Sequence, residues 1–424
     1  MNLQKHAELI LAVARILFVN GQSTERIVAA VEQLAQTLGS RVEVMPRWGE
    51  LHIELRDHDR LLSEVATPSG VDMQRVAAAT RTIANVEAGR LAPDSAVSEI
   101  NAIAKAPLHP TWLFTLAAAA GAVALAVISG IEHLAAAGLI LVSAATGAVV
   151  RRALAQWTTN VFAQPFCAAL LAGIIGGVAV RCSLSSSLRL VAVCPCLVLV
   201  PGPHLLNSAS DLVNGRIHLG AARLLYALLV MVAIVTGLFL GLAMLGVSLP
   251  VDPIGRVVPL CQDVMAAGVA VFAFSVFFMM PLRMFGWPLA VGMLAHALRW
   301  AAIAVLGMGV AGAAFAACFV AGAILTPVSH RRHMPFAAIG FASVVSLMPG
   351  VYIFRMASGL AQIAGASPPT GAPLSAIIGN GMTALMIILA MSLGLIVPKM
   401  LIESVHEKRQ RIRSRATKEP AAVR

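Results

Sequence analysis

From about residue 111 onward, apolar residues dominate the chain in long runs that short polar or glycine-rich segments separate. Each run is close to the roughly 20 residues that an α-helix needs to cross a bilayer. We predict about ten membrane spans, at residues 111–130, 133–150, 161–180, 188–206, 219–246, 262–280, 288–308, 309–326, 336–357 and 374–397. The expected fold class is an all-α polytopic membrane protein.

The first 108 residues follow a different pattern. Apolar positions recur at helical spacing over 3–17, 27–38, 71–88 and 94–104. Between the second and third of these segments, apolar and charged residues alternate around 42–55, which indicates a β-hairpin. We expect residues 1–108 to form a small cytosolic α/β domain, attached through the proline-rich segment 107–110.

Two Pro-Gly pairs interrupt the apolar runs. Pro201-Gly202 is one, and Pro349-Gly350 is the other, 148 residues later. Proline removes a backbone N–H and glycine relaxes the backbone, so each pair should break its helix. Irregular backbone at membrane depth is tolerated only where protein buries it or where it lines a cavity. Two breaks in corresponding places are typical of a transporter built from repeats.

Shorter matches support the same repeat. Ala119-Ala120-Gly121 matches Ala266-Ala267-Gly268 at an offset of 147, and Ala172-Gly173 matches Ala321-Gly322 at an offset of 149. Each half would hold five helices, an odd number, so the second half should be inverted relative to the first. The expected domains are residues 1–108, a first five-helix module at 109–248, a second at 249–398, and a basic cytosolic tail at 399–424.

Composition and charge agree with a membrane protein. The chain is 58% hydrophobic and 12% charged, with a mean hydropathy of +0.84. Its net charge of +11 comes from the flanks and loops, because residues 109–398 carry only 12 Lys and Arg against 4 Asp and Glu. Placing both termini in the cytoplasm puts most basic loops inside. Nothing in this distribution indicates nucleic-acid binding.

The six cysteines lie in or near apolar segments, where we expect them to act as small packing residues. Cys194-Pro195-Cys196 would suit a soft metal ion, but the chain has no P-loop and no phosphorylation motif of the kind metal pumps require. We therefore expect no cofactor and no metal site.

Three stretches carry a resemblance to a known family. They are residues 17–27, residues 200–224 and Met348-Pro349-Gly350. Through them, and over nearly its whole length, the chain resembles the threonine/serine exporter family of bacterial membrane proteins. The resemblance implies export of threonine and serine across the cytoplasmic (inner) membrane, driven by the proton motive force, and leaves a homo-oligomer open. Some relatives, split into two chains, resemble exporters of C4-dicarboxylates such as succinate, so a dicarboxylate is the alternative substrate.

Ionisable and polar residues inside membrane spans are costly and mark candidate sites. The candidates for substrate binding and translocation are Pro201, Gly202, His204, Asn207, Asp211, Asp263, His296, Arg299, Pro349, Gly350, Arg355 and Asn380. We expect Asn207 to contact the substrate and Asp211 to bind a proton or the substrate ammonium. An interior arginine would suit a substrate carboxylate.

Structural roles remain open for most of these residues. Asp211 could instead pair with Arg216 or Arg223, and Asp263 could be a charge favoured by a helix amino terminus. His204 could be a hydrogen-bonded histidine beside the break, or could couple protons. Among the rest, Arg355 could extend toward lipid headgroups, and Asn380 could lie in a glycine-rich packing interface.

Two functions of other classes compete with an exporter. The amino-terminal domain could be a membrane-tethered enzyme that uses His52, Glu54 and His58, although the simpler interpretation of these residues is the solvated face of a strand. It could also be a regulatory sensor attached to a channel. Convergence of the three side chains in a cleft would favour the enzyme.

Overall fold

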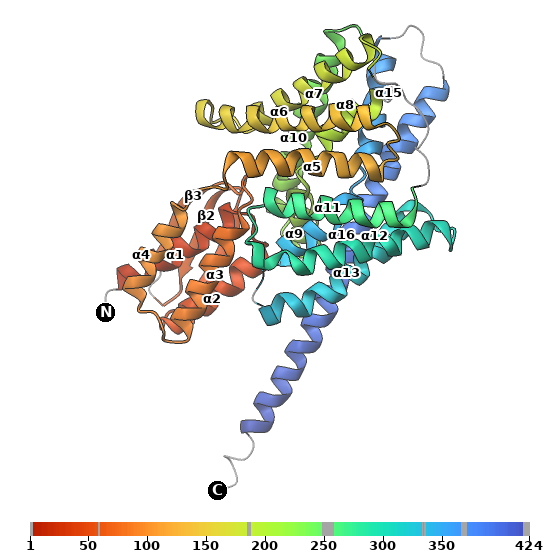
Figure 1. Cartoon of the computed structure of the whole chain (residues 1–424). Helices are drawn as coiled ribbons and strands as arrows, with labels where there is room; N and C mark the ends of the chain where they lie inside the picture. Colours follow the sequence, from red (N-terminus) through yellow and green to blue (C-terminus); the bar gives the residue numbers. More distant parts are fainter. Residues whose placement is uncertain are drawn as a thin grey trace.

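The computed structural model describes residues 3–57, 60–184, 188–247, 258–332, 334, 336–365 and 371–418. A small part with a β-sheet lies beside a larger assembly of long helices, and the last helix extends beyond both (Figure 1).

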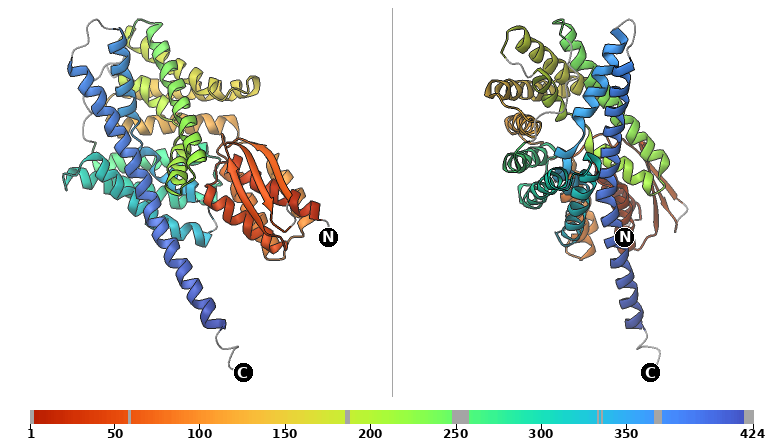
Figure 2. Two further views of the ribbon diagram at one scale, coloured as in Figure 1. Left: turned by 180° about the vertical axis from the view of Figure 1, so that it is seen from behind. Right: turned by 90° about the vertical axis from the view of Figure 1, so that its right-hand side faces the viewer.

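The amino-terminal part contains a sheet and four helices. Its elements are α1 (Leu3–Val19), α2 (Thr24–Thr37), β1 (Val42–Arg47), β2 (Gly49–Leu55), β3 (Arg60–Ala66), α3 (Met73–Glu87) and α4 (Pro93–Ala104). The strands are antiparallel in the order β1-β2-β3. Alternate residues of β2, namely Leu51, Ile53 and Leu55, are buried and place one face of the sheet in the core. Figure 2 shows the sheet covering one side of the helices.

The predicted hairpin corresponds to β1 and β2, but the sequence did not predict β3. Along β3 the apolar residues do not keep to one face, since Leu61 and Val65 are both exposed while Leu62 between them is half-buried. The strand is therefore held by its backbone pairing with β2 rather than by an alternating apolar pattern.

Long helices make up the rest of the described chain. They are α5 (Thr111–Ile128), α6 (Leu134–Trp157), α7 (Ala163–Arg181), α8 (Leu188–Leu197), α9 (Gly202–Val213), α10 (Ile217–Ala243), α11 (Leu260–Phe277), α12 (Gly286–Ala304), α13 (Val310–Arg332), α14 (Phe336–Val344), α15 (Gly350–Gly365) and α16 (Gly371–Lys418), with short 3₁₀ turns at Leu282–Met284 and Val345–Leu347.

Seven of the described helices are long and apolar enough to cross a membrane, and two bent pairs raise the number to nine if each pair is one span. The pairs are α8 with α9, bent by 55°, and α14 with α15, bent by 52°. Ten spans were predicted. The remaining one corresponds to α12, which lies outside these nine and carries His296 and Arg299.

Small residues let helices of the same predicted module pack closely. A methyl group added at Gly173 of α7 would lie 2.3 Å from the Leu238 carbonyl oxygen of α10. One added at Gly322 of α13 would lie 2.9 Å from the Leu395 carbonyl oxygen of α16. Both contacts leave no room for a side chain, so third and fifth helices meet backbone to backbone in each module.

Helices α5 and α11, the first of each predicted module, lie side by side and antiparallel. Phe114 near the start of α5 contacts Phe277 at the end of α11, with ring centroids 4.4 Å apart. Ala124, toward the end of α5, packs against Ala266 and Ala270, nearer the start of α11. Opposite directions for these two helices are what an inverted repeat requires, and the inversion of the whole modules stays a prediction.

The amino-terminal part is joined to one end of the helical assembly. The backbone N–H of Met73 donates to the Phe278 carbonyl oxygen at 2.9 Å, and Trp48 contacts Tyr226 with ring centroids 5.0 Å apart. Helix α16 continues without interruption past residue 398, where we had expected a separate tail. Just beyond that point, Lys399 forms an ion pair with Glu25 of α2.

Candidate functional site

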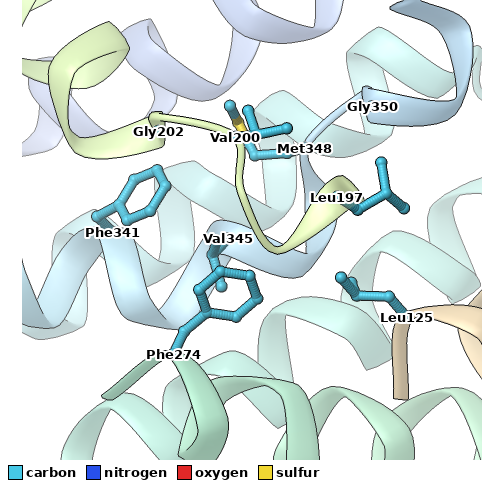
Figure 3. Close-up of a pocket in the computed structure, with 9 residues that line it drawn as sticks. All are labelled: Leu125, Leu197, Val200, Gly202, Phe274, Phe341, Val345, Met348 and Gly350. Carbon is cyan, nitrogen blue, oxygen red and sulfur yellow. The ribbon is translucent and has the colours of Figure 1, made fainter. Parts of the chain in front are cut away.

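The two interrupted helices cross at their breaks (Figure 3). A methyl group added at Gly202 would lie 1.8 Å from Cζ of Phe341 on α14, and one added at Gly350 would lie 2.1 Å from Cδ2 of Leu197 on α8. Each Pro-Gly pair therefore breaks its own helix and also makes room for a side chain of the other interrupted helix. Both breaks occur where the sequence predicted them.

The crossing itself is nearly closed. It holds a cavity of about 20 Å³, lined mainly by apolar side chains that include Leu125, Phe274 and Val345. That is space for about one water molecule, so the crossing in this conformation does not accommodate a metabolite.

A much larger cavity of about 360 Å³ lies beside the second break. It is bounded by the carboxyl end of α5, the amino ends of α11 and α13, the carboxyl end of α12, and the segment from Ser346 to Tyr352. The amino-terminal part contacts the opposite end of α11, so this cavity lies on the far side of the helical assembly from that part. Its volume falls in the range of about 300–1,000 Å³ that small-molecule sites occupy.

Two polar residues that line this cavity, Asp263 and Ser346, are joined by the His296 side chain behind them. His296 Nδ1 lies 2.9 Å from Oδ2 of Asp263, and His296 Nε2 lies 2.8 Å from Oγ of Ser346. All three residues are buried. A neutral imidazole that donates from Nδ1 to the carboxylate and accepts at Nε2 from the serine hydroxyl satisfies both contacts. The imidazole thereby links the start of α11 to the second break.

Arg299 lies one turn after His296 on α12 and also lines the cavity. Its Nε is buried and has no hydrogen-bond partner in the described part of the chain. Of the described residues that line the cavity, Asp263 is the acidic one and Arg299 the basic one. The cavity therefore presents one acidic group and one basic donor with unused hydrogen-bonding capacity.

Asp211 belongs to a second polar cluster, which lies against the amino-terminal part. Its Oδ2 lies 2.7 Å from Nη1 of Arg223, and Arg216 lies 3.8 Å away. The same Nη1 donates to the Thr24 hydroxyl at 3.2 Å. Asn207 donates to the Gly21 carbonyl oxygen at 3.2 Å. Asn207 on α9 and Arg223 on α10 are thus bonded to residues 21–24 of the amino-terminal part, which pack against these two helices.

The other predicted residues are distributed around these two clusters. His204 is buried at the start of α9, with its ring edge-on to Tyr226 and centroids 4.9 Å apart. Arg355 is buried on α15. Asn380 donates to the Ala376 carbonyl oxygen of its own helix at 2.7 Å and is not among the residues that line the large cavity. Whether any of them contacts substrate stays a prediction.

In the amino-terminal part, the titratable residues of β2 face outward. His52 contacts Glu50 at 2.9 Å, and Glu54 pairs in register with Glu43 of the neighbouring strand. His58 lies outside the described residues. Within the described chain, no three His, Cys, Asp or Glu side chains come together as a metal ion would need.

Two participants of these clusters were not predicted from the sequence. Ser346 stands three residues before Pro349, and Thr24 lies almost 200 residues from Arg223. Ser346 belongs to no predicted motif, and Thr24 lies in the stretch 17–27 that carries the family resemblance, at no spacing that indicates a contact with Arg223. Ser346 could have been found only as a polar residue immediately before a predicted break.

Comparison with known proteins now decides the family. Residues 8–245, more than half of the chain, match the family model of a threonine/serine exporter. The chain belongs to the threonine/serine exporter family. Residues 263–401 match a second threonine/serine exporter model of the same kind. A Mycobacterium tuberculosis protein named "Probable threonine/serine exporter" is 24% identical over 387 residues, which cover 84% of this chain and 70% of that relative. No solved structure matches the chain. Together with the apolar helices, the family makes this a multi-pass membrane protein of exporter type.

Proposed function

We propose that this protein exports threonine and serine across the bacterial inner membrane, and that the 360 Å³ cavity beside the second break is the substrate site. The observation that carries the proposal is that both Asp263 and Arg299 line the cavity. A zwitterionic amino acid has one cation and one anion to match them. A dicarboxylate would need two cationic partners, and among the described lining residues Arg299 is the basic one.

The roles follow from the chemistry of the side chains. Arg299, whose Nε–H has no partner in the described chain, binds the substrate carboxylate, since a guanidinium matches a carboxylate in planar geometry. Asp263 binds the ammonium group. His296 holds the Asp263 carboxylate in place from the other side, because it contacts both that carboxylate and Ser346.

Proton coupling would use the same carboxylate. A proton and an ammonium group compete for Asp263, so a proton that enters from outside displaces the amino acid outward. His296 can hold or pass that proton because its other ring nitrogen contacts Ser346 at the break. Occupancy of Asp263 would thereby affect the geometry of the second interrupted helix.

Alternating access would come from movement of two inverted modules about the crossing in Figure 3. We place both termini in the cytoplasm, following the basic loops. The amino-terminal part then lies inside and the large cavity faces outward.

The test uses proteoliposomes containing the full chain and preloaded with labelled threonine, serine or succinate, with an imposed proton gradient and with a protonophore. We expect efflux of the two amino acids that the protonophore suppresses. Arg299→Gln should lower that efflux at least tenfold, while Arg152→Gln, which changes an arginine that does not line the cavity, should leave it unchanged. Efflux of succinate alone would overturn the substrate assignment, and efflux unaffected by the protonophore would overturn the coupling.

A further inference from the structure

Arg299 has a counterpart in the first predicted module. Adding 148, the offset that relates Pro201 to Pro349, to residue 151 gives residue 299. Arg151 lies on α6 and Arg299 on α12, the second helix of each module. In the first spans the matching offset is 147, which relates Asp263 to Leu116 on α5, so the acidic residue has no counterpart there.

Arg151 has unused hydrogen-bonding capacity like that of Arg299. Its Nε and Nη1 are buried and have no hydrogen-bond partner in the described chain. Its guanidinium carbon lies 5.6 Å from the ring centroid of Phe114 and 5.4 Å from that of Phe277. Those rings attract the charge but offer no acceptor for its N–H groups. The hydroxyl oxygens of Ser143 and Thr115 are also buried without a partner there.

Arg151 and Ser143 line a small cavity beside the first break. Pro195, Val198 and Leu199 of that break form another part of its wall. The cavity holds about 10 Å³, too little for more than a single water molecule. Phe277, at the end of α11 nearest the amino-terminal part, also lines it. This cavity therefore lies on the opposite side of the crossing from the 360 Å³ cavity.

The two cavities have matching parts in opposite states. The 10 Å³ cavity lies beside the first break, and the 360 Å³ cavity lies beside the second break, where Leu190 and Leu197 of α8 also line it. Each carries an arginine with at least one N–H group that has no partner in the described chain, at positions 148 residues apart. One is open and the other is closed. In a carrier whose halves exchange conformations, the closed cavity is the one that opens when the other closes.

We propose that Arg151 is a second carboxylate-binding residue, which binds the substrate on the cytoplasmic side when the 10 Å³ cavity, here called the inner cavity, opens. This inference rests on the proposed export function. The inner site anchors the substrate by its carboxylate and contacts the rest with the Ser143 hydroxyl. Leu116 and Ala148 occupy the positions equivalent to Asp263 and His296, so this site has neither the acid nor the imidazole. The pair of Asp263 and His296 belongs to the 360 Å³ cavity on the outer side. The amino acid that binds from the cytoplasm therefore does not compete with a proton for a carboxylate.

Arg152 provides the matched control. It is the next residue of α6, its guanidinium carbon lies 4.4 Å from the Phe114 ring centroid, and it is not among the residues lining the inner cavity. A purely structural role at this end of α6, or attraction to lipid headgroups, would affect Arg151 and Arg152 alike.

The experiment measures the half-saturating threonine concentration on each face of the membrane. Inside-out vesicles present the cytoplasmic face and right-side-out vesicles present the outer face. Arg151→Gln should raise the half-saturating concentration at least tenfold on the cytoplasmic face and less than twofold on the outer face, with partial recovery in Arg151→Lys. Arg299→Gln should show the reverse, and Arg152→Gln should change neither face.

Equal changes on both faces for Arg151→Gln, or no change on the cytoplasmic face, would overturn the inference. The same outcome as for Arg152→Gln would also overturn it. A failure of the proposed function is seen separately, in the wild-type vesicles. If these transport succinate and neither amino acid, the same face-by-face comparison is made with succinate and decides the role of Arg151.

Discussion

The helical assembly holds two charged clusters, one around Asp211 and one around Asp263. They differ in whether their charged side chains line a large cavity. Asp211 is bonded to Arg223, which is bonded in turn to Thr24. Nη2 of Arg223 has no partner in the described chain, but neither charged residue lines the cavities described above. Asp263 is bonded to His296, but it lines a cavity of about 360 Å³ together with an arginine that has an unpartnered Nε. Breaking a buried ion pair is costly, so the pair of Asp211 and Arg223 has a structural role. Charged groups that line a cavity of metabolite size, as Asp263 and Arg299 do, are available to a ligand.

This difference changes the weight of the sequence candidates. Asp211 follows the first break and was our first choice for the substrate ammonium, with pairing to Arg216 or Arg223 as its structural alternative. The contacts in the structure are those of the alternative. Asp263 is the other acidic candidate, and it lines a cavity of suitable size for a metabolite.

The largest effect is expected for Asp263→Asn. This change keeps the shape of the side chain and removes the negative charge that would bind either the ammonium group or a proton. We expect proton-driven threonine efflux from proteoliposomes to fall about 100-fold, with a change in thermal unfolding temperature of less than a few degrees. A variant that retains efflux would show that the cavity is not the site.

Asp211→Ala should give the opposite result, with a large loss of stability. Removing one partner of a buried pair typically costs about 3–5 kcal/mol, because it leaves Arg223 buried without its carboxylate. Unfolding in detergent, followed by denaturant titration, measures the loss. The double variant Asp211→Ala with Arg223→Met should recover part of it, because the orphaned charge is then also gone. Additive losses in the double variant would contradict the pairing.

Gly202 and Gly350 look equivalent in the sequence, but at the crossing of the interrupted helices they have different neighbours. Gly202→Ala should cost about 1–3 kcal/mol, because its new methyl group meets the stiff ring of Phe341. Gly350→Ala should cost less, since it meets the end of Leu197, a flexible side chain that can change rotamer. Thermal unfolding of the two variants ranks them, and equal losses would contradict this account.

The smallest effect is expected for Thr24→Val. The substitution keeps the volume of the side chain and removes one hydrogen bond to Arg223, which is worth about 1–2 kcal/mol. The stability that Thr24→Val removes in the Asp211→Ala background should differ from what it removes in the wild type. The reason is that both residues bond the Arg223 guanidinium. A strictly additive result would place Thr24 outside the cluster.

The sequence predicted what depends on local chemistry. The breaks at Pro201-Gly202 and Pro349-Gly350 follow from the residues themselves, and so does the β1-β2 hairpin with its alternating pattern. The sequence did not predict the association of Asp263 with His296, which are 33 residues apart on different helices. Helix packing decides such pairs, and no spacing along the chain indicates them. The same holds for Thr24 and Arg223.

The hydrophobic pattern also did not predict where the last helix ends. We ended the tenth span at residue 397 because the apolar residues stop there, but α16 continues to Lys418. A helix outside the bilayer needs backbone hydrogen bonds and tolerant side chains, and charged residues such as Lys and Arg have good helix propensity. Loss of apolarity therefore marks where the membrane ends rather than where the helix ends.

Helix α16 is 48 residues long, which corresponds to about 72 Å at 1.5 Å per residue. A bilayer core is about 30 Å thick, so a large fraction of this rod projects beyond it. Lys399, on the same rod, is tied to Glu25 of α2. A tilt of a few degrees within the membrane would move the far end of α16 by several ångströms, and the amino-terminal part, attached next to the helix-internal Pro398, would move with it. The longest helix thus offers a mechanical readout, outside the membrane, of what happens inside it.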